Sequence, residues 1–245
     1  MTHTPHSANV ALITGSSRGL GFTLADFLAA QGYILIIGAR NETALEEAAQ
    51  KLRRYGHPVH ALPGDVSDPE HRRALARRAL EQGGLDLLVN NASDLGVSPL
   101  PELTRYPLER LRALFEANVF APLGLVQETL APLRARRGLV VNISSDAAVG
   151  AYPGWGAYGS SKAALELLTR TLAAELDEVG AVLVDPGDLQ TQMHQDAFPG
   201  EDISDRPLPE VTLPFWAWLL GQDPLRVSGG RFEAQGERWE LPRVA

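Results

Sequence analysis

The sequence has no cysteine and no long apolar run. The absence of cysteine among 245 residues excludes disulfide bonds, thiolate catalysis and cysteine-bound zinc. No stretch of about 18 or more apolar residues is available to span a membrane. The first residues, MTHTPHSAN, lack the apolar core of a signal peptide. These absences predict a cytoplasmic protein whose residues 1–8 form a flexible N-terminal tail.

Lysine is also scarce in this sequence. Only two of the 22 basic residues are lysines, Lys51 and Lys162, and the rest are arginines. Basic residues are in turn fewer than the 30 acidic ones, and the net charge is −8. This balance argues against nucleic acid or an anionic membrane as the main partner. Because His57, His60 and His71 do not pair with carboxylates at metal-ligand spacings, we expect no metal site.

Short apolar runs alternate with longer amphipathic ones along the chain. The short runs are continuously apolar, which is typical of strands in a parallel sheet buried on both faces. We expect strands over residues 10–14, 34–38, 59–62, 85–90, 139–144, 181–185 and 231–234. Right-handed crossovers between such strands predict a single α/β domain over residues 9–245: a doubly wound, Rossmann-type parallel sheet of about seven strands, flanked by helices on both faces.

Local signals predict several helix boundaries. Asn41 and Asp68 are residue types that cap helix N-termini, and Pro69 suits a first helical turn. A long helix is expected over residues 108–134. Residues 192–208 contain several acids, two prolines and little periodicity, which predicts a mobile flap.

The first expected strand is followed by a glycine-rich turn, TGSSRGLG at residues 14–21. Gly15, Gly19 and Gly21 allow a tight turn and a close approach of the backbone to a pyrophosphate, and the next helix offers free N–H groups to the anion. The glycines alone also fit an ordinary tight turn. Their position between a strand and a helix favours nucleotide binding, with the spacing G-x-x-x-G-x-G.

The end of the second expected strand indicates which dinucleotide binds. An acid at this place accepts the 2′-hydroxyl of NAD, whereas a cation accommodates the 2′-phosphate of NADP. The sequence there is GARN, with Arg40 and no acid, and Arg18 in the glycine turn is a second candidate. The fork of a guanidinium can bind two phosphate oxygens. Although both arginines also fit a solvated surface, the pattern favours NADP(H) over NAD(H).

The stretch YGSSK places Lys162 four residues after Tyr158 on an expected helix, so the two side chains share one face. A tyrosine pKa is ordinarily about 10, and a neighbouring ammonium group favours the phenolate and lowers that pKa. Such a tyrosine can donate a proton to a forming alkoxide or remove one from an alcohol. Ser145, at the carboxyl end of a strand, can hydrogen-bond the same substrate oxygen. Alone, the tyrosine and lysine would also fit a surface pair.

Together these motifs resemble the short-chain dehydrogenase/reductase family, in its single-domain branch. The order and spacing of the motifs make the combination specific, although each is short. The matching segments are TGSSRGLG at 14–21, Asp65, NNAS at 90–93, Asn118, NISS at 142–145, YGSSK at 158–162 and PGDLQT at 186–191.

The resemblance implies roles for the site residues. In that family a tyrosine is the acid/base, a lysine binds the nicotinamide ribose, a serine orients the substrate and an asparagine supports a water-linked proton relay. These roles fall on Tyr158, Lys162, Ser145 and Asn118. The implied cofactor-binding residues are Gly15, Ser17, Arg18, Gly19, Leu20, Gly21, Arg40, Asp65, Val66, Asn90, Asn91, Ala92, Tyr158, Lys162, Pro186, Gly187, Leu189 and Thr191.

Two features of the residues support these roles. Pro122 lacks the N–H that would pair with the carbonyl of Asn118, so we expect a kink there and a carbonyl free to hold the relay water; a kink without a chemical role is the alternative. Lys162 is a lysine in a chain that otherwise uses arginine, and it offers a compact charge instead of a fork. Ser93 is a departure, because the family usually has glycine at that position.

The substrate is less well specified. We expect Tyr152, Trp155, Met193, His194 and Phe198 to contact it, which suggests an apolar or aromatic carbonyl compound. The leading hypothesis is an NADP(H)-dependent oxidoreductase acting on a carbonyl or secondary alcohol. The alternatives are a 3-oxoacyl-(acyl carrier protein) reductase and a non-catalytic NADP-binding sensor. The resemblance also implies a homodimer or homotetramer.

Overall fold

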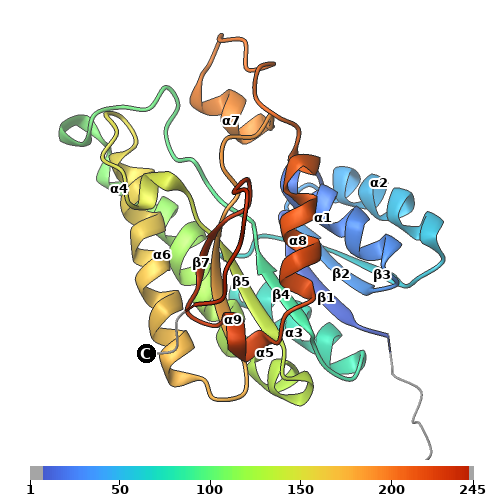
Figure 1. The fold of residues 1–245 in the computed structure, drawn as a ribbon. Coiled ribbons are helices and arrows are strands. Elements are labelled where there is room, and N and C mark those ends of the chain that lie inside the picture. The colour runs from blue at the N-terminus through green and yellow to red at the C-terminus, as the bar shows by residue number, and fades with distance from the viewer. Residues whose placement is uncertain (1–7, 243–245) are drawn as a thin grey trace, which may run out of the picture.

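The computed structural model describes residues 8–242 and contains a seven-stranded sheet in which all strands are parallel (Figure 1). The predicted tail over residues 1–8 falls almost wholly on residues 1–7, which lie outside the described residues. The strand order is β3-β2-β1-β4-β5-β6-β7. The strands are β1 Val10–Thr14, β2 Ile34–Ala39, β3 Val59–Pro63, β4 Leu87–Asn90, β5 Leu139–Ile143, β6 Gly180–Asp185 and β7 Arg231–Glu233. The predicted doubly wound sheet is confirmed.

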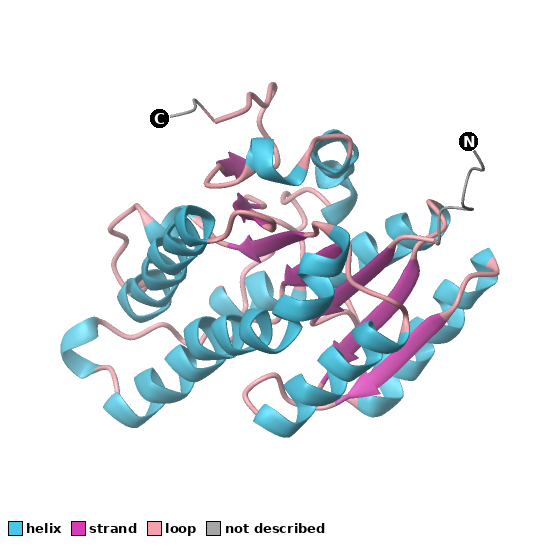
Figure 2. Ribbon diagram, turned by 90° about the horizontal axis from the view of Figure 1, so that it is seen from below, coloured by secondary structure: helices cyan, strands magenta, loops and turns pink. Residues whose placement is uncertain are grey.

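Helices cover both faces of the sheet (Figure 2). One face is covered by α1 Gly19–Ala30, α2 Glu42–Leu52 and α8 Leu213–Leu220, and the other by α3 Pro69–Glu81, α5 Ala121–Arg136 and α6 Gly156–Glu175. The shorter helical segments are η1 Arg53–Tyr55, η2 Leu103–Arg105, α4 Leu108–Phe115, η3 Glu116–Phe120, η4 Asp146–Ala148, α7 Gln192–Ala197, η5 Pro209–Thr212 and α9 Pro224–Val227. No helix within residues 8–242 is long and apolar enough to cross a membrane.

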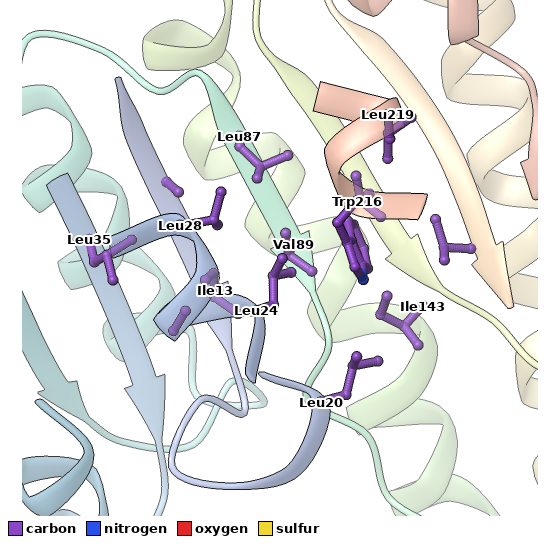
Figure 3. Close-up of a cluster of buried hydrophobic side chains, with 14 of the residues drawn as sticks. Ile13, Leu20, Leu24, Leu28, Leu35, Leu87, Val89, Ile143, Trp216 and Leu219 are labelled. Atoms are coloured by element: carbon purple, nitrogen blue, oxygen red, sulfur yellow. The ribbon is translucent and has the colours of Figure 1, made fainter. Parts of the chain in front are cut away.

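The continuous apolar strands are explained by two cores, one on each face. Along β1, Ala11 and Ile13 pack in the cluster with α1, α2 and α8, whereas Val10 and Leu12 pack in the cluster with α3 and α5. Figure 3 shows part of the first cluster, with Trp216 of α8 beside the strands. Each such large side chain contributes about 1.5–3 kcal/mol by its burial. The sheet is therefore a rigid platform for the loops at its carboxyl edge.

The helix expected over residues 108–134 is interrupted, and the interruption lies at Asn118. Between α4 and α5 the segment η3 is a π-helical turn, in which the Ala121 amide donates to the Glu116 carbonyl five residues back. Pro122 follows at the start of α5. Because proline has no N–H to donate within a regular helix, a wider turn before it accommodates the ring. The local break predicted from Pro122 is thus a π-turn.

The segment predicted as a flap contains a short helix. Thr191 caps α7, with its hydroxyl accepting a hydrogen bond from the His194 amide at 3.3 Å. The chain then runs without regular structure to η5. A threonine at an N-cap was the signal for this helix.

Candidate active site

A large cleft of about 1370 Å³ lies at the carboxyl ends of the parallel strands. Its walls come from the segments that follow β1, β2, β3, β4, β5 and β6. The strand order reverses between β1 and β4, and ligands of such sheets bind outside the strand ends at this reversal. The cleft at this reversal is therefore the candidate binding site, and the predicted residues converge there.

The structure brings most of the predicted site residues to this cleft. The lining residues among them are Gly15, Ser17, Arg18, Gly19, Leu20, Gly21, Arg40, Asp65, Val66, Asn91, Ala92, Ser145, Tyr152, Trp155, Tyr158, Lys162, Pro186, Gly187, Leu189, Thr191, Met193, His194 and Phe198. Asn90 and Asn118 do not line it. Those two are buried behind the wall.

The glycine turn after β1 is tightly built. Gly15 has φ 69° and its amide donates to the Gly38 carbonyl at 2.7 Å. A Cβ on Gly21 would lie 2.5 Å from Asn91 Nδ2 and closer still to the Gly15 carbonyl oxygen. Thr14 Oγ1 accepts hydrogen bonds from the amides of Asn91 and Ala92 at 3.1 and 3.0 Å, which ties the turn to the end of β4. Only glycine fits these places.

The turn fits a dinucleotide phosphate. Helix α1 begins at Gly19, and the residue before it, Arg18, caps it with no side-chain hydrogen bond. The first amides of α1 thus have no side-chain acceptor from their cap, and they lie at the wall of the cleft. Such a helix N-terminus binds phosphate through its N–H groups and its dipole.

The end of the cleft next to β2 and β3 carries two exposed arginines. Arg18 and Arg40 both line it, together with Asn41 and with the segment that follows β3. Asp65 is the acid at this end, and its carboxylate accepts a hydrogen bond from the Ser67 amide at 2.8 Å. It follows β3, whereas the two residues directly after β2, where the ribose 2′ position is read, are Arg40 and Asn41 and include no acid. The arrangement fits a 2′-phosphate.

The other end of the cleft is formed by α6 and the end of β5. Tyr158 is only 7 % exposed, and Lys162 Nζ lies 5.5 Å from the centre of its ring. Lys162 donates a hydrogen bond to the Ile143 carbonyl at 2.8 Å. Ser145 Oγ accepts from the Ala147 amide at 3.2 Å and donates to Asp146 at 3.0 Å. Tyr158, Lys162 and Ser145, which were predicted to act together, therefore all lie at this end of the cleft.

Burial has the largest effect on the pKa values of Tyr158 and Lys162. Burial raises the pKa of Tyr158 well above its ordinary value; hydrogen bonding with Ser93 lowers it, the charges of Asp185 and Asp146 raise it further, and hydrogen bonding with Ser145 lowers it. Burial lowers the pKa of Lys162 to about 8, and the charge of Asp185 opposes this change. The expectation of a tyrosine pKa lowered by lysine is thus not met in this structure, because desolvation of the phenolate is the largest effect on it.

Asn118 and Asn90 do not line the cleft, and their side chains hydrogen-bond neighbouring segments to one another. Asn118 Oδ1 accepts from the Asp94 amide at 2.7 Å and from Ser93 Oγ at 3.2 Å, and its Nδ2 donates to Ser161 Oγ at 3.1 Å. This asparagine joins the loop after β4 to α6. Asn90 Nδ2 donates to Asn142 Oδ1 at 2.8 Å, between neighbouring strands.

Aromatic side chains form the wall next to Tyr158. Trp155 packs edge-on against the Tyr158 ring with centroids 5.7 Å apart, and Phe198 lies 6.0 Å from Trp155. The His194 ring lies tilted against the Phe198 ring, with centroids 5.0 Å apart. Met193 belongs to the same apolar cluster. Of the five residues predicted to contact substrate, only Tyr152 is exposed, at the rim.

Sequence reasoning missed a polar cluster behind Ser145. Arg231 of β7 hydrogen-bonds Glu166 of α6 and Asp185 of β6. The position of Asp185 directly before Pro186–Gly187 was the available signal. Among residues 8–242, no three histidine or acidic side chains form a group that could hold a metal ion.

The lowered pKa of Lys162 predicts how stability depends on pH. The unfolded lysine keeps its proton up to its ordinary pKa of 10.5, whereas the folded one releases it at about 8. Between these values the unfolded state binds more protons, so the free energy of unfolding rises with pH, by about 2 kcal/mol from roughly pH 8 to pH 9.5. Tyr158 has the opposite effect only above its ordinary pKa of 10.0. Urea unfolding across this window checks the rise.

Lys162→Met is the matched control, because it removes the titrating group. Its free energy of unfolding should lack this rise. Equal slopes in the two proteins would contradict the assignment of the low pKa to Lys162.

The known proteins that resemble this chain are dehydrogenases and oxidoreductases. Residues 9–202 match the family model described as short chain dehydrogenase. The chain is 32 % identical over 238 residues to 11-beta-hydroxysteroid dehydrogenase A of Sesamum indicum, covering 95 % of this chain and 68 % of that protein. The structure of the oxidoreductase yciK from E. coli is 30 % identical, with a TM-score of 0.86, covering 96 % of this chain and 100 % of that one. A short chain dehydrogenase from Shigella flexneri 2a, solved in complex with NADP, is 29 % identical with a TM-score of 0.87, covering 95 % and 100 %.

Proposed function

Because this chain belongs to the short-chain dehydrogenase/reductase family and is an enzyme of that family, we propose that it transfers a hydride between NADP(H) and a carbonyl compound or secondary alcohol. The observation that carries the proposal is the meeting of Tyr158, Lys162 and Ser145 at one end of a cleft whose other end presents Arg18 and Arg40. A single dinucleotide can lie across the sheet between the two ends.

The proposed binding of the cofactor uses backbone and arginine groups. The N-terminus of α1 and the glycine turn hold the pyrophosphate, and Arg18 and Arg40 hold the 2′-phosphate. The turn at Pro186–Gly187 and the Thr191 side chain hold the nicotinamide end. When bound, the nicotinamide supplies the hydride, or accepts it in the reverse direction.

Tyr158 is the proposed acid/base. Its raised pKa keeps the hydroxyl protonated at neutral pH, which suits donation of a proton to a forming alkoxide during reduction. Ser145 orients the substrate oxygen through its hydroxyl, and Asn118 positions the loop after β4 against α6. Lys162, held by the Ile143 carbonyl, places a cation near the phenol, which assists loss of the tyrosine proton during alcohol oxidation.

The proposed substrate is an apolar or aromatic carbonyl compound. Trp155, Met193 and Phe198 cluster with Tyr158, so a substrate that reaches the tyrosine contacts apolar surface. A flat ring can stack in this wall, as aromatic side chains favour. Residues 192–208, which carry part of the wall, are the proposed flap over the site.

The proposed assembly is a homodimer or homotetramer. Phe120 beside α5 and Leu167 on α6 are exposed large apolar side chains, 54 % and 65 % accessible. Burial of such side chains between subunits is favourable.

The test of the proposed function is a screen of ketones, aldehydes and alcohols, followed at the NADPH absorbance with NADH in parallel. We expect reduction of aromatic ketones and a preference for NADPH. Arg40→Ala should lower kcat/KM for NADPH by about 10- to 100-fold, because a charge-assisted hydrogen bond contributes about 1.5–3 kcal/mol. The kcat/KM for NADH should change little.

Arg77→Ala is the matched control for this variant. Arg77 is an exposed arginine on α3 that does not line the cleft, so its removal changes the net charge equally. If both variants weaken NADPH to the same extent, the role given to Arg40 is wrong.

A further inference from the structure

Arg231 contacts three elements of the reacting centre at once. It lies on β7, the edge strand beside β6 (Figure 1). Its Nε donates to Glu166 Oε1 at 2.8 Å, and its Nη2 donates to the Ser145 carbonyl at 3.2 Å and to Asp185 Oδ2 at 3.1 Å. The three acceptors belong to α6, to the end of β5 and to the end of β6.

Each acceptor is close in the chain to a residue of the proposed reaction. Glu166 follows Lys162 by one helical turn, so the two lie on the same face of α6. The Ser145 carbonyl is the backbone of the proposed substrate-orienting serine. Asp185 accepts a hydrogen bond from the Gly187 amide at 3.0 Å, within the turn proposed to hold the nicotinamide end.

The cluster is buried and almost fully paired. The side chains of Glu166, Asp185 and Arg231 are 3 %, 7 % and 19 % exposed. Glu166 also accepts from Ser144 Oγ at 2.7 Å and from Arg170 at 2.7 Å. Buried charges require such partners, and the loss of one is expensive. The positions of the Glu166, Asp185 and Arg231 side chains are therefore strongly constrained.

We propose that Arg231 is a positioning residue, which fixes Ser145 and the turn at Pro186–Gly187 relative to the helix that carries Tyr158 and Lys162. This inference rests on the proposed function, because it concerns the alignment of those groups. A guanidinium suits the role, since its planar fork presents several donors in fixed directions. An ammonium group carries the same charge on a flexible stem and cannot reproduce these directions.

Arg231 also balances charge near the phenol. The charged groups around Tyr158 are Asp185 on β6, Asp146 in η4 and Lys162 on α6. Asp185 is the acid that Arg231 pairs with. Without the Arg231 cation the field at Tyr158 becomes more negative, and the pH profile of alcohol oxidation should move to higher pH. A loss of stability alone would not move that profile.

The experiment compares Arg231→Met, Arg231→Lys and Arg170→Met. Arg170 is the matched control, because it also pairs with Glu166 but is not bonded to Ser145 or Asp185. At saturating substrate and NADPH we expect kcat to fall about 100-fold in Arg231→Met, as for a misplacement of about 1 Å, and to stay within about 2-fold in Arg170→Met. Arg231→Lys should restore the pH profile but only part of kcat.

Two outcomes would overturn the inference. One is an equal loss of kcat in Arg231→Met and Arg170→Met, and the other is full recovery of kcat in Arg231→Lys. Amide hydrogen exchange gives a readout that needs no activity: Arg231→Lys should speed exchange in residues 144–148 and 185–187, and Arg170→Met should not. This readout also serves if Arg231→Met does not fold.

Failure of the proposed function is a separate result. If the wild-type protein turns over no carbonyl compound or alcohol with NADPH, the function is wrong whatever the variants do. If amide hydrogen exchange in Arg231→Lys is also unchanged, the proposal that Arg231 fixes residues 144–148 and 185–187 is refuted as well.

Discussion

Tyr158→Phe should lower kcat by about 1000-fold or more while NADPH still binds. A positioned acid or base contributes about 10²- to 10⁴-fold, and the variant removes only the hydroxyl that would carry the proton. The phenylalanine ring keeps its packing against Trp155, 5.7 Å away. Steady-state kinetics on the best substrate of the screen, with NADPH binding followed by fluorescence, checks both parts.

Tyr55→Phe is the matched control. Its hydroxyl bonds Asp26 at 3.2 Å in a helical turn away from the cleft, so we expect kcat to stay within about 2-fold. A Tyr158→Phe protein with substantial turnover would contradict the proton-transfer role of Tyr158 and would not bear on the proposed hydride transfer.

Gly21→Ala should abolish measurable NADPH binding at micromolar concentrations. The new methyl group would lie 2.5 Å from Asn91 Nδ2 and closer to the Gly15 carbonyl. The obstructing oxygen belongs to the backbone of the turn itself, so the turn must move, at a cost of about 1–3 kcal/mol in stability. Isothermal titration with NADPH and urea unfolding measure the two effects.

Gly221→Ala provides the comparison for this substitution. Gly221 follows α8, and the nearest atom to its added Cβ would be the Trp218 carbonyl oxygen at 3.4 Å. NADPH binding should be unchanged there. If Gly21→Ala binds NADPH like the wild type, the glycine turn is not the pyrophosphate site.

Local patterns in the sequence were enough to predict the sheet and the glycine turn. The strand at residues 10–14 is apolar at every position, and the structure explains this by a core on each face. Tyr158 and Lys162 were found in the same way, because residues four apart share a helical face. In each case the signal lies within a few consecutive residues.

Interactions between distant residues could not be predicted in this way. The raised pKa of Tyr158 depends on burial by segments from across the chain. Asn118 reaches Asp94, 24 residues away, and Arg231 reaches Ser145, 86 residues away. The sequence pattern at either end of such a bond carries no mark of the other end.

The order of strands has a consequence for redesign of this enzyme. Arg40 follows β2, whereas Ser145 follows β5, and β1 and β4 lie between them. With neighbouring strands about 4.8 Å apart, the two sites are separated by about 14 Å. At that distance the effects of substitutions on the free energy of unfolding add. Substitutions at Arg40 and at Ser145 can therefore be optimised in separate libraries and then combined, with costs in stability that sum.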